Sequence, residues 1–306
     1  MDFRLTGLVA APYTPFHADG TLNPSVILAY AELLLESGVS GVFVSGSTGE
    51  GHSLSLAERI AVTDAWVAAS KGRFPVVVHV GHNCQSDART LAAHAQSAGA
   101  QAIAALAPSY YKPKSVDDLI EFLSPIAAAA PKLPLYFYNI PSMTSVVLSV
   151  PELLMKGRKR IPTFHGAKFT HNDLMELQEC LALGDFDIVF GFDEMLLAGL
   201  TFGCKGAVGS TYNFAAPLYR RIIAAFEKGD LETACREQRK SVELIRTLYD
   251  FGLMRAGKSV MAMQGLDCGP VRSPLSLIAS QEMTYLRDRL SRFDCFARPL
   301  RLGAGS

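Results

Sequence analysis

The sequence predicts a single α/β unit, a (β/α)8 TIM barrel with a C-terminal helical appendage. Between residues 7 and 220, eight short apolar segments alternate with helical patterns, and the strand signals stop after Ala215. Nearly continuous apolar runs are typical of parallel strands that are covered on both faces. Eight strand–helix repeats are the number that closes a TIM barrel. We therefore expect a catalytic barrel over residues 1–214 and a helical extension packed on it over residues 215–306.

The predicted strands are short, and each ends before a turn or a helix start. They are GLVAAP (7–12), GVFVSG (41–46), PVVVHVG (75–81), AIAALAP (102–108), LPLYFYN (133–139), TFHGAKF (163–169), IVFGF (188–192) and GAVGS (206–210).

Predicted helices begin where a capping residue precedes an apolar period. Ser55 and Glu58 fit a capping box. Asn23 stands before a proline in a first turn, which is a common start. Further caps are expected at Ser86, Ser115 and Asn172, and Asp193-Glu194 places negative charge at another helix start. After Ala215, three segments are predicted as helices, namely residues 216–230, 231–251 and 274–293.

Composition excludes several classes of partner. Lys+Arg and Asp+Glu balance at 29 each without a charged block, so we expect no nucleic acid and no anionic membrane surface as partner. The six cysteines form no C-x-x-C pair, which is typical of free thiols in a reducing compartment. No apolar run is long enough to span a bilayer, and the first residues lack a signal-peptide pattern. We expect a cytoplasmic protein with a small-molecule substrate.

Lys168 is the first candidate for chemistry, because it stands at the end of a predicted apolar strand. Lysine is rarely buried, since desolvating an ammonium is costly. The same desolvation favours the neutral amine, which can attack a carbonyl and form a Schiff base. The alternative is a structural lysine whose stem lies along the core while its ammonium reaches water.

Active sites of TIM barrels lie at the carboxyl ends of the strands. The residues at these ends are one lysine, several phenols, hydroxyls and a glycine-rich turn, with one acidic pair. They are Ser47, Thr48 and Glu50; Pro108, Tyr110 and Tyr111; Tyr138 and Asn139; Lys168 and Thr170; Asp193 and Glu194; and Gly209, Ser210 and Thr211.

No metal and no other cofactor is expected at these strand ends, because metal ions prefer grouped imidazoles, thiolates or carboxylates. His79 and His82 are too isolated to indicate a metal site, and His165 is interpreted as a packed core histidine.

The GSTGE turn at residues 46–50 lacks the G-K-[ST] ending of a nucleotide-binding P-loop. Its backbone N–H groups can still hold a small anion such as a carboxylate. A glycine-rich loop without a ligand remains the alternative. A lysine and a tyrosine at neighbouring strand ends favour imine chemistry, in which the Schiff base accepts electrons and the phenol carries a proton. The residues therefore predict a metal-free aldolase.

The sequence resembles the pyruvate-dependent class I aldolases of the dihydrodipicolinate synthase/N-acetylneuraminate lyase family over nearly its whole length. The matching motifs are GSTGE (46–50), YNIP (138–141), GAKFT (166–170), GFDE (191–194) and GSTYN (209–213).

The resemblance implies a covalent imine on Lys168 and proton transfer by Tyr138. It implies that Ser47 and Thr48 bind the pyruvate carboxylate. It also implies that Tyr110 reaches the catalytic site of a neighbouring subunit, in a homotetramer built as a dimer of dimers.

Two features favour the sialic-acid branch of this family. GFDE and GSTYN are similar to the loops that hold the hydroxyl chain of the sugar, which implies substrate binding by Thr170, Gly191, Asp193, Glu194 and Ser210. Lysine-pathway synthases carry an arginine for a second carboxylate, and Met143 stands in its place here, without a bidentate fork. Ser109 and Ser145 also depart from the family pattern.

The resemblance implies reversible cleavage of N-acetylneuraminate to N-acetylmannosamine and pyruvate. Three alternatives remain. The chain could be another pyruvate-dependent aldolase or dehydratase that acts on a 2-keto-3-deoxy sugar acid. It could be a sugar-acid-binding regulator without catalysis, although the intact pair of Lys168 and Tyr138 argues against this. Asp193-Glu194 could serve only as a helix cap.

Overall fold

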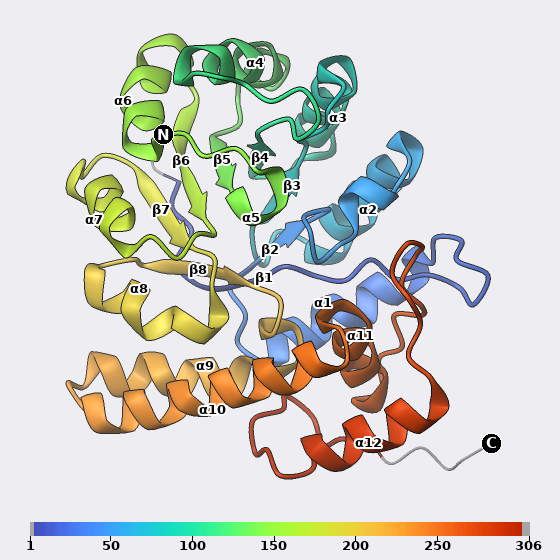
Figure 1. The fold of residues 1–306 in the computed structure, drawn as a ribbon. Coiled ribbons are helices and arrows are strands. Elements are labelled where there is room, and N and C mark those ends of the chain that lie inside the picture. Colours follow the sequence, from blue (N-terminus) through green and yellow to red (C-terminus); the bar gives the residue numbers. More distant parts are fainter. Residues whose placement is uncertain (1–2, 302–306) are drawn as a thin grey trace.

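The computed structural model describes residues 3–301 and contains a closed barrel of eight parallel strands (Figure 1). Each strand pairs with its neighbours in sequence, and β8 pairs with β1. The predicted barrel is therefore confirmed, and every strand overlaps its predicted segment. The strands are β1 (Gly7–Ala10), β2 (Gly41–Val44), β3 (Val76–His79), β4 (Ala102–Leu106), β5 (Leu135–Asn139), β6 (Phe164–Phe169), β7 (Asp187–Phe190) and β8 (Gly206–Gly209).

Helices surround the barrel, and a further group packs at one side of it (Figure 1). The surrounding helices are α1 (Ile27–Glu36), α2 (Leu56–Ser70), α3 (Gln85–Ala98), α4 (Val116–Ala129), α5 (Pro141–Thr144), α6 (Val150–Arg160), α7 (Leu174–Ala182) and α8 (Leu196–Phe202). Short 3₁₀ helices are η1 (Pro24–Val26), η2 (Gly51–Ser53) and η3 (Asp193–Met195). The C-terminal group is α9 (Tyr212–Glu227), α10 (Leu231–Asp250), α11 (Leu253–Met263) and α12 (Ser280–Leu290).

Two of the predicted caps are confirmed. The Ser55 side chain accepts from the backbone N–H of Glu58, and the Glu58 carboxylate accepts from the N–H of Ser55. Ser115 makes the same reciprocal pair with Asp118.

Asn23 stands at the N-cap of η1 with Pro24 in the first turn, as predicted, but its side chain accepts from the Ser25 hydroxyl instead of a helix N–H. Two predicted caps are wrong. Helix α3 begins at Gln85, so Ser86 lies inside it. Helix α7 is capped by Asp173 in place of Asn172, because the Asp173 carboxylate reaches two free N–H groups of the first turn.

Helix α11 was not predicted. Its central residues, Ala256 to Met261, are buried in an unbroken run, and Gly252 stands at its N-cap without a capping side chain. Helix α9 starts at Tyr212, before the predicted helix, and bends at Ala215, where φ is −127°.

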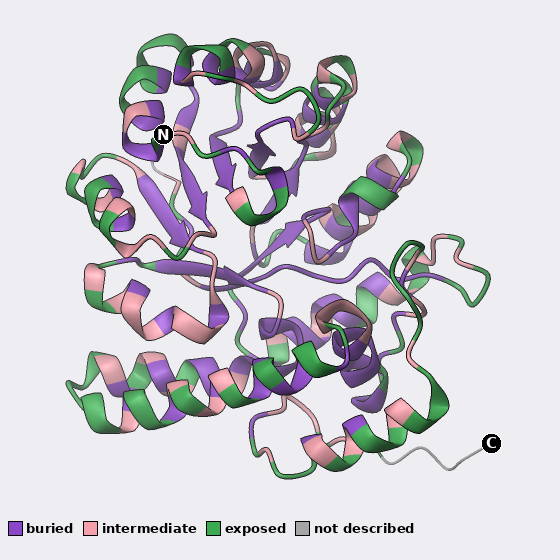
Figure 2. Cartoon of the chain, in the orientation of Figure 1, coloured by how far each residue is buried: buried purple, intermediate pink, exposed green. Residues whose placement is uncertain are grey.

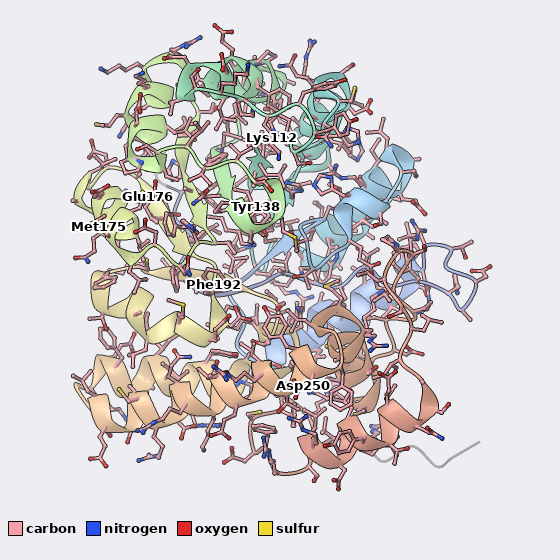
Figure 3. The ribbon with its side chains drawn as sticks, viewed as in Figure 1. Lys112, Tyr138, Met175, Glu176, Phe192 and Asp250 are labelled. Carbon is pink, nitrogen blue, oxygen red and sulfur yellow. The ribbon has the colours of Figure 1, made fainter. Side chains whose placement is uncertain are left out.

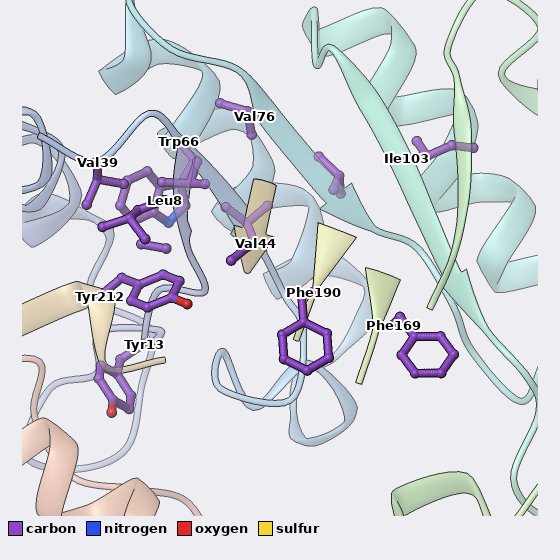
Figure 4. Close-up of a cluster of buried hydrophobic side chains, with 14 of the residues drawn as sticks. Leu8, Tyr13, Val39, Val44, Trp66, Val76, Ile103, Phe169, Phe190 and Tyr212 are labelled. Carbon is purple, nitrogen blue, oxygen red and sulfur yellow. The ribbon is translucent and has the colours of Figure 1, made fainter. Parts of the chain in front are cut away.

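Two apolar layers hold the barrel together. One fills its interior and includes Val9, Phe43, Tyr136, Tyr138 and Val208. The other lies between the strands and the helices (Figure 4). All strand residues except the half-buried Gly7 and His165 are accordingly buried, whereas the surrounding helices expose their outer faces (Figure 2). A polar side chain that points inward at a strand end is therefore held in an apolar surround.

No helix within residues 3–301 is long and apolar enough to cross a membrane.

Candidate active site

Lys168 and Tyr138 face each other across neighbouring strands. They are register partners in the β5–β6 pair, and both side chains are buried. The Lys168 Nζ atom lies 4.0 Å from the centre of the Tyr138 ring and 4.4 Å from the centre of the Phe43 ring. Within residues 3–301, no carboxylate lies within 4.0 Å of this ammonium. The amine is held by aromatic rings, which leaves it free to react.

The turn that follows β2 brings Ser47 beside the phenol, with Ser47 Oγ 3.3 Å from Tyr138 Oη. Ser45 and Glu50, near the two ends of the turn, have φ values of 57° and 51°, in the region that favours glycine. A Cβ atom on Gly51 would lie 1.9 Å from the Ser45 carbonyl oxygen, so only glycine fits there. The chain therefore folds back tightly and presents Ser47 and Thr48 to the barrel mouth.

Glu50 is anchored from the C-terminal helices. Its carboxylate lies 3.1 Å from Nζ of Lys258 on α11, and both side chains are almost fully buried. The same carboxylate accepts from the backbone N–H of Arg272 at 2.8 Å, and Lys258 donates to the Pro270 carbonyl at 2.6 Å. No sequence pattern predicted this ion pair. The one local signal was an isolated lysine within the apolar segment of α11.

The predicted sugar-binding residues lie at the ends of β6, β7 and β8. A Cβ atom on Gly191 would lie 2.0 Å from Thr170 Oγ1, so glycine at 191 leaves room for this hydroxyl. The buried Asp193 carboxylate accepts from Thr211, at 2.8 Å from N and 2.6 Å from Oγ1. It thus binds Thr211 instead of the amides of η3, and the alternative of a simple helix cap is wrong for Asp193.

Both acids at this end hold protons more tightly than usual. Burial raises the pKa of Asp193, although Thr211 and the charge of Lys168 act in the opposite direction. Burial and the neighbouring Asp193 raise the pKa of Glu194 to about 6. The site therefore has an amine and a phenol at its base and two perturbed carboxyl groups at one side.

The predicted residues gather in one pocket of about 170 Å³ at the carboxyl ends of the strands. Figure 3 labels Tyr138 and Phe192, which lie toward the centre of the ring of helices. The predicted residues in this pocket are Ser47, Thr48, Tyr138, Lys168, Thr170, Gly191, Asp193, Glu194 and Ser210. The pocket also contains residues that the sequence analysis did not assign to it, chiefly Ala11, Ile140, Ser142, Phe192, Ile245, Tyr249 and Leu253.

Tyr110 does not line this pocket in the single chain. Its side chain is 78% exposed and packs edge-on against Tyr111, with ring centres 5.0 Å apart. A larger pocket, of about 850 Å³, lies between the segment after β1 and α11. Its Arg255 and Lys258 are already paired with carboxylates, so it offers less free chemistry than the Lys168 pocket.

The histidines have separate surroundings. The ring of His165 packs on Tyr136 and contacts the Phe3 carbonyl, but the residue is half-buried and not part of the fully buried core. His79 is buried, and burial together with Arg59 holds its pKa well below the usual value. The prediction that His82 is isolated is wrong, because donor atoms of His82, Cys84 and Asp87 lie within 4.8 Å of one another. These three residues do not line the Lys168 pocket.

An amine, a phenol and an anion-binding turn in one pocket can condense with a keto acid, and the two carboxyl groups can accept hydrogen bonds from hydroxyls. Comparison with known proteins adds to this geometry. The sequence profile described as "Dihydrodipicolinate synthetase family" matches residues 4–293.

Individual relatives match over most of their length. N-acetylneuraminate lyase of Xenopus tropicalis is 40% identical to the chain over 297 residues, with 95% of this chain and 97% of the relative covered. Among solved structures, the Proteus mirabilis N-acetylneuraminate lyase has a TM-score of 0.92 at 38% identity, and 94% of this chain and 98% of that one are covered. The Aliivibrio salmonicida N-acetylneuraminate lyase (sialic acid aldolase) also has a TM-score of 0.92, at 40% identity, with 94% and 97% covered.

Proposed function

We propose that this chain, which belongs to the dihydrodipicolinate synthetase family, reversibly cleaves N-acetylneuraminate to N-acetylmannosamine and pyruvate. The observation that carries the proposal is the buried amine of Lys168 against the Tyr138 ring, in a pocket with two carboxyl groups on one side. The name that the relatives share, N-acetylneuraminate lyase, supports this substrate.

In the proposed mechanism, neutral Lys168 attacks C2 of the open-chain keto acid. The Tyr138 hydroxyl gives its proton to the C2 hydroxyl, which leaves as water, so that a protonated imine and the Tyr138 phenolate remain. The C3–C4 bond then breaks, and its electron pair moves through C3 toward the imine nitrogen to form an enamine. The Tyr138 phenolate takes the proton of the C4 hydroxyl as the C4 aldehyde forms, and it then gives this proton to C3 of the enamine. Hydrolysis of the resulting imine releases pyruvate and returns one proton to the phenolate, which restores Tyr138 and neutral Lys168. The imine is the electron sink, so the proposal assigns no metal and no other cofactor.

The carboxylate of the substrate is assigned to the turn after β2. Ser47 and Thr48 line the pocket there, and Ser47 also contacts the phenol. A carboxylate held by this turn would fix C2 near Lys168 and C4 near Tyr138, which is the orientation that the cleavage needs.

The hydroxyl chain of the sugar is assigned to Thr170, Gly191, Asp193, Glu194 and Ser210, all of which line the pocket. Two carboxyl groups at this end would repel a second carboxylate on the substrate. Met143, which also lines the pocket, cannot form the paired hydrogen bonds that a second carboxylate needs. These features favour a polyol over a dicarboxylic acid.

The assembly is part of the proposal. An exposed set of apolar side chains, Tyr110, Tyr111, Met143 and Val147, offers a surface for a second copy of the chain. Tyr110 is assigned to the site of that neighbouring subunit, in a homotetramer that acts in the cytoplasm.

The direct test is pyruvate release from N-acetylneuraminate, compared with release from a 2-keto-3-deoxy sugar acid that lacks the N-acetyl group. Faster release from N-acetylneuraminate is expected. Faster release from the second compound would support the alternative aldolase, and binding of either compound without pyruvate release would support the regulator.

A further inference from the structure

The Asp193 carboxylate is fixed more firmly than a simple ligand for a hydroxyl requires. One of its oxygens, Oδ2, receives both hydrogen bonds from Thr211. The other, Oδ1, packs against Gly209, where an added Cβ atom would lie 1.8 Å from it. The side chain thus has one orientation within the pocket.

A chain of hydroxyls extends from this carboxylate into the C-terminal helices. Thr211 Oγ1 lies 2.6 Å from Oη of Tyr219 on α9, and this Oη lies 3.1 Å from Oγ of Ser241 on α10. Because the Thr211 hydroxyl donates to Asp193, the Tyr219 hydroxyl must donate to Thr211. Ser241 Oγ also lies 3.3 Å from the Asp193 carbonyl oxygen, and its single proton is available either to this carbonyl or to Tyr219.

Thr211, Tyr219 and Ser241 are each at most 1% exposed. Burying a hydroxyl costs free energy unless it is hydrogen-bonded, and apolar residues of similar shape would pack between two helices without that cost. A second contact from α10 supports the same residue, because Gln238 Nε2 donates to the Asp193 carbonyl oxygen at 3.2 Å. The polar groups at this helix contact therefore converge on Asp193.

Helix α10 also forms part of the pocket wall. Ile245 and Tyr249 line the pocket, and they follow Ser241 at intervals of four residues, which places all three on one face of the helix. In Figure 1, α10 runs beside α9 and below α8, and it contacts η3, which carries Asp193.

We propose that Tyr219 and Ser241 are positioning residues that orient Asp193 toward substrate hydroxyls, so that the C-terminal helices set the preference for a long polyol. The inference rests on the proposed function, because it needs Asp193 to bind the hydroxyl chain. Neither residue touches the reacting bond.

The test runs the aldol reaction in the synthetic direction and compares two acceptors. N-acetylmannosamine carries the polyol, whereas glycolaldehyde has only two carbons and cannot reach Asp193 from the bond-forming position. Tyr219→Phe removes one hydroxyl and keeps the ring that packs on Tyr212 at 4.7 Å. Its kcat/KM for N-acetylmannosamine should fall about tenfold, the usual scale for a lost hydrogen bond in a chain that ends on a charged group. Its kcat/KM for glycolaldehyde should stay within about twofold.

Tyr30→Phe is the matched control. Tyr30 is also a fully buried tyrosine, but its hydroxyl accepts from the Tyr13 N–H and does not contact Asp193. The ratio of the two acceptors should not change in this variant. An equal loss for both acceptors in Tyr219→Phe, or no loss for either, would overturn the proposal.

A double variant tests whether Tyr219 acts through Asp193. In Asp193→Ala, adding Tyr219→Phe should have no further effect on the acceptor ratio, and an undiminished further effect would overturn the proposal. Ser241→Ala serves in the same design if Tyr219→Phe does not fold, since alanine suits a helix interior.

Failure of the proposed function would appear separately, as a wild-type enzyme that does not join pyruvate to N-acetylmannosamine. The best long-chain polyol aldehyde found for the wild type would then replace N-acetylmannosamine as the long acceptor. The ratio of its kcat/KM to that for glycolaldehyde would still show whether Tyr219 and Ser241 act through Asp193.

Discussion

At the scale of single residues, the site depends on which groups are buried without a partner of opposite charge. Lys168 is buried among aromatic rings, whereas Lys258, equally buried, has the carboxylate of Glu50 at 3.1 Å. The carboxylate of Glu50 favours the charged form of Lys258 and opposes the burial that lowers the pKa of this lysine, whereas an amine that forms an imine must lose its proton. Lys168 is therefore the expected site of imine formation, and Lys258 is its buried control.

Tyr138→Phe separates imine formation from bond cleavage. The ring that packs on Lys168 stays, so pyruvate should still be trapped on the lysine. The proton carrier is lost, so kcat for cleavage should fall by about a hundredfold or more. Intact mass after borohydride reduction measures imine formation, and the rate of pyruvate release measures bond cleavage. Loss of trapping together with cleavage would contradict the assigned role.

The raised pKa of Glu194 predicts that kcat/KM depends on pH. Its pKa is raised to about 6, so the carboxylate that accepts hydrogen bonds from hydroxyls is lost as the pH falls through 6. For N-acetylneuraminate, kcat/KM should therefore decrease between pH 7 and pH 5. Glu194→Gln should be less active at pH 7.5 and should lack the part of the profile that falls near pH 6. A wild-type profile unchanged by this substitution would contradict the assignment.

The same shift bears on stability. A carboxyl group with a raised pKa in the folded state binds more protons there than in the unfolded chain, so its contribution to stability decreases as the pH rises from the unfolded pKa through 6. Glu194→Gln should accordingly have a higher Tm than the wild type at pH 7.5, and this difference should disappear at pH 4. Thermal scans at the two pH values test the sign.

At the scale of elements, the strand ends could be predicted from the sequence. The contacts from the C-terminal helices that hold the residues at these ends could not. Eight apolar runs bounded by turns indicated the barrel, and the barrel rule then selected the strand-end residues that now line the pocket. Helix α11 and its Lys258 were missed because the helix follows α10 after two residues and has Gly252 at its N-cap, without a capping side chain that would mark a new start. The bond from Arg272 N to Glu50 joins residues 222 positions apart, and no local pattern encodes such a contact.

The helices could be predicted, but the residue that caps each helix could not always be. Asn172 and Asp173 are both good capping residues and are adjacent in sequence. Which of them caps α7 depends on the residue at which the backbone turns into the helix. Such a difference of one position leaves the element itself unchanged, so the predicted fold was unaffected.

The ion pair between α11 and the β2 turn gives an element-scale prediction. Lys258→Met leaves Glu50 buried with an uncompensated charge, which should lower the free energy of unfolding by about 3–5 kcal/mol. The double variant Glu50→Gln with Lys258→Met removes both charges and keeps an oxygen for the Arg272 N–H, so it should regain part of the loss. Urea unfolding of the three proteins measures this. A double variant less stable than Lys258→Met would contradict the account.

At the scale of the whole molecule, the chain alone leaves a tyrosine pair exposed at the barrel mouth. Tyr110 and Tyr111 are 78% and 86% exposed, which is unusual for side chains with this much apolar area. The family fold by itself does not fix the reaction, because one barrel supports many chemistries. The residues of the pocket, and not the fold, therefore support the proposed substrate.

The proposed tetramer predicts a mass in solution of four times the 33.0 kDa of one chain. Tyr110→Ala should lower kcat if the residue completes a neighbouring site, and light scattering of the variant would show whether assembly is also lost. A fully active monomer would contradict this part of the proposal.

The central claim is that Lys168 forms an imine with the keto acid and that the sugar is cleaved while it is attached. The most direct measurement is borohydride reduction during incubation with N-acetylneuraminate, followed by intact mass and peptide mapping. The account predicts a three-carbon adduct on Lys168 and none on Lys258, and no adduct in Lys168→Arg. An adduct on a different lysine, or N-acetylneuraminate cleaved at an undiminished rate by Lys168→Arg, would contradict it.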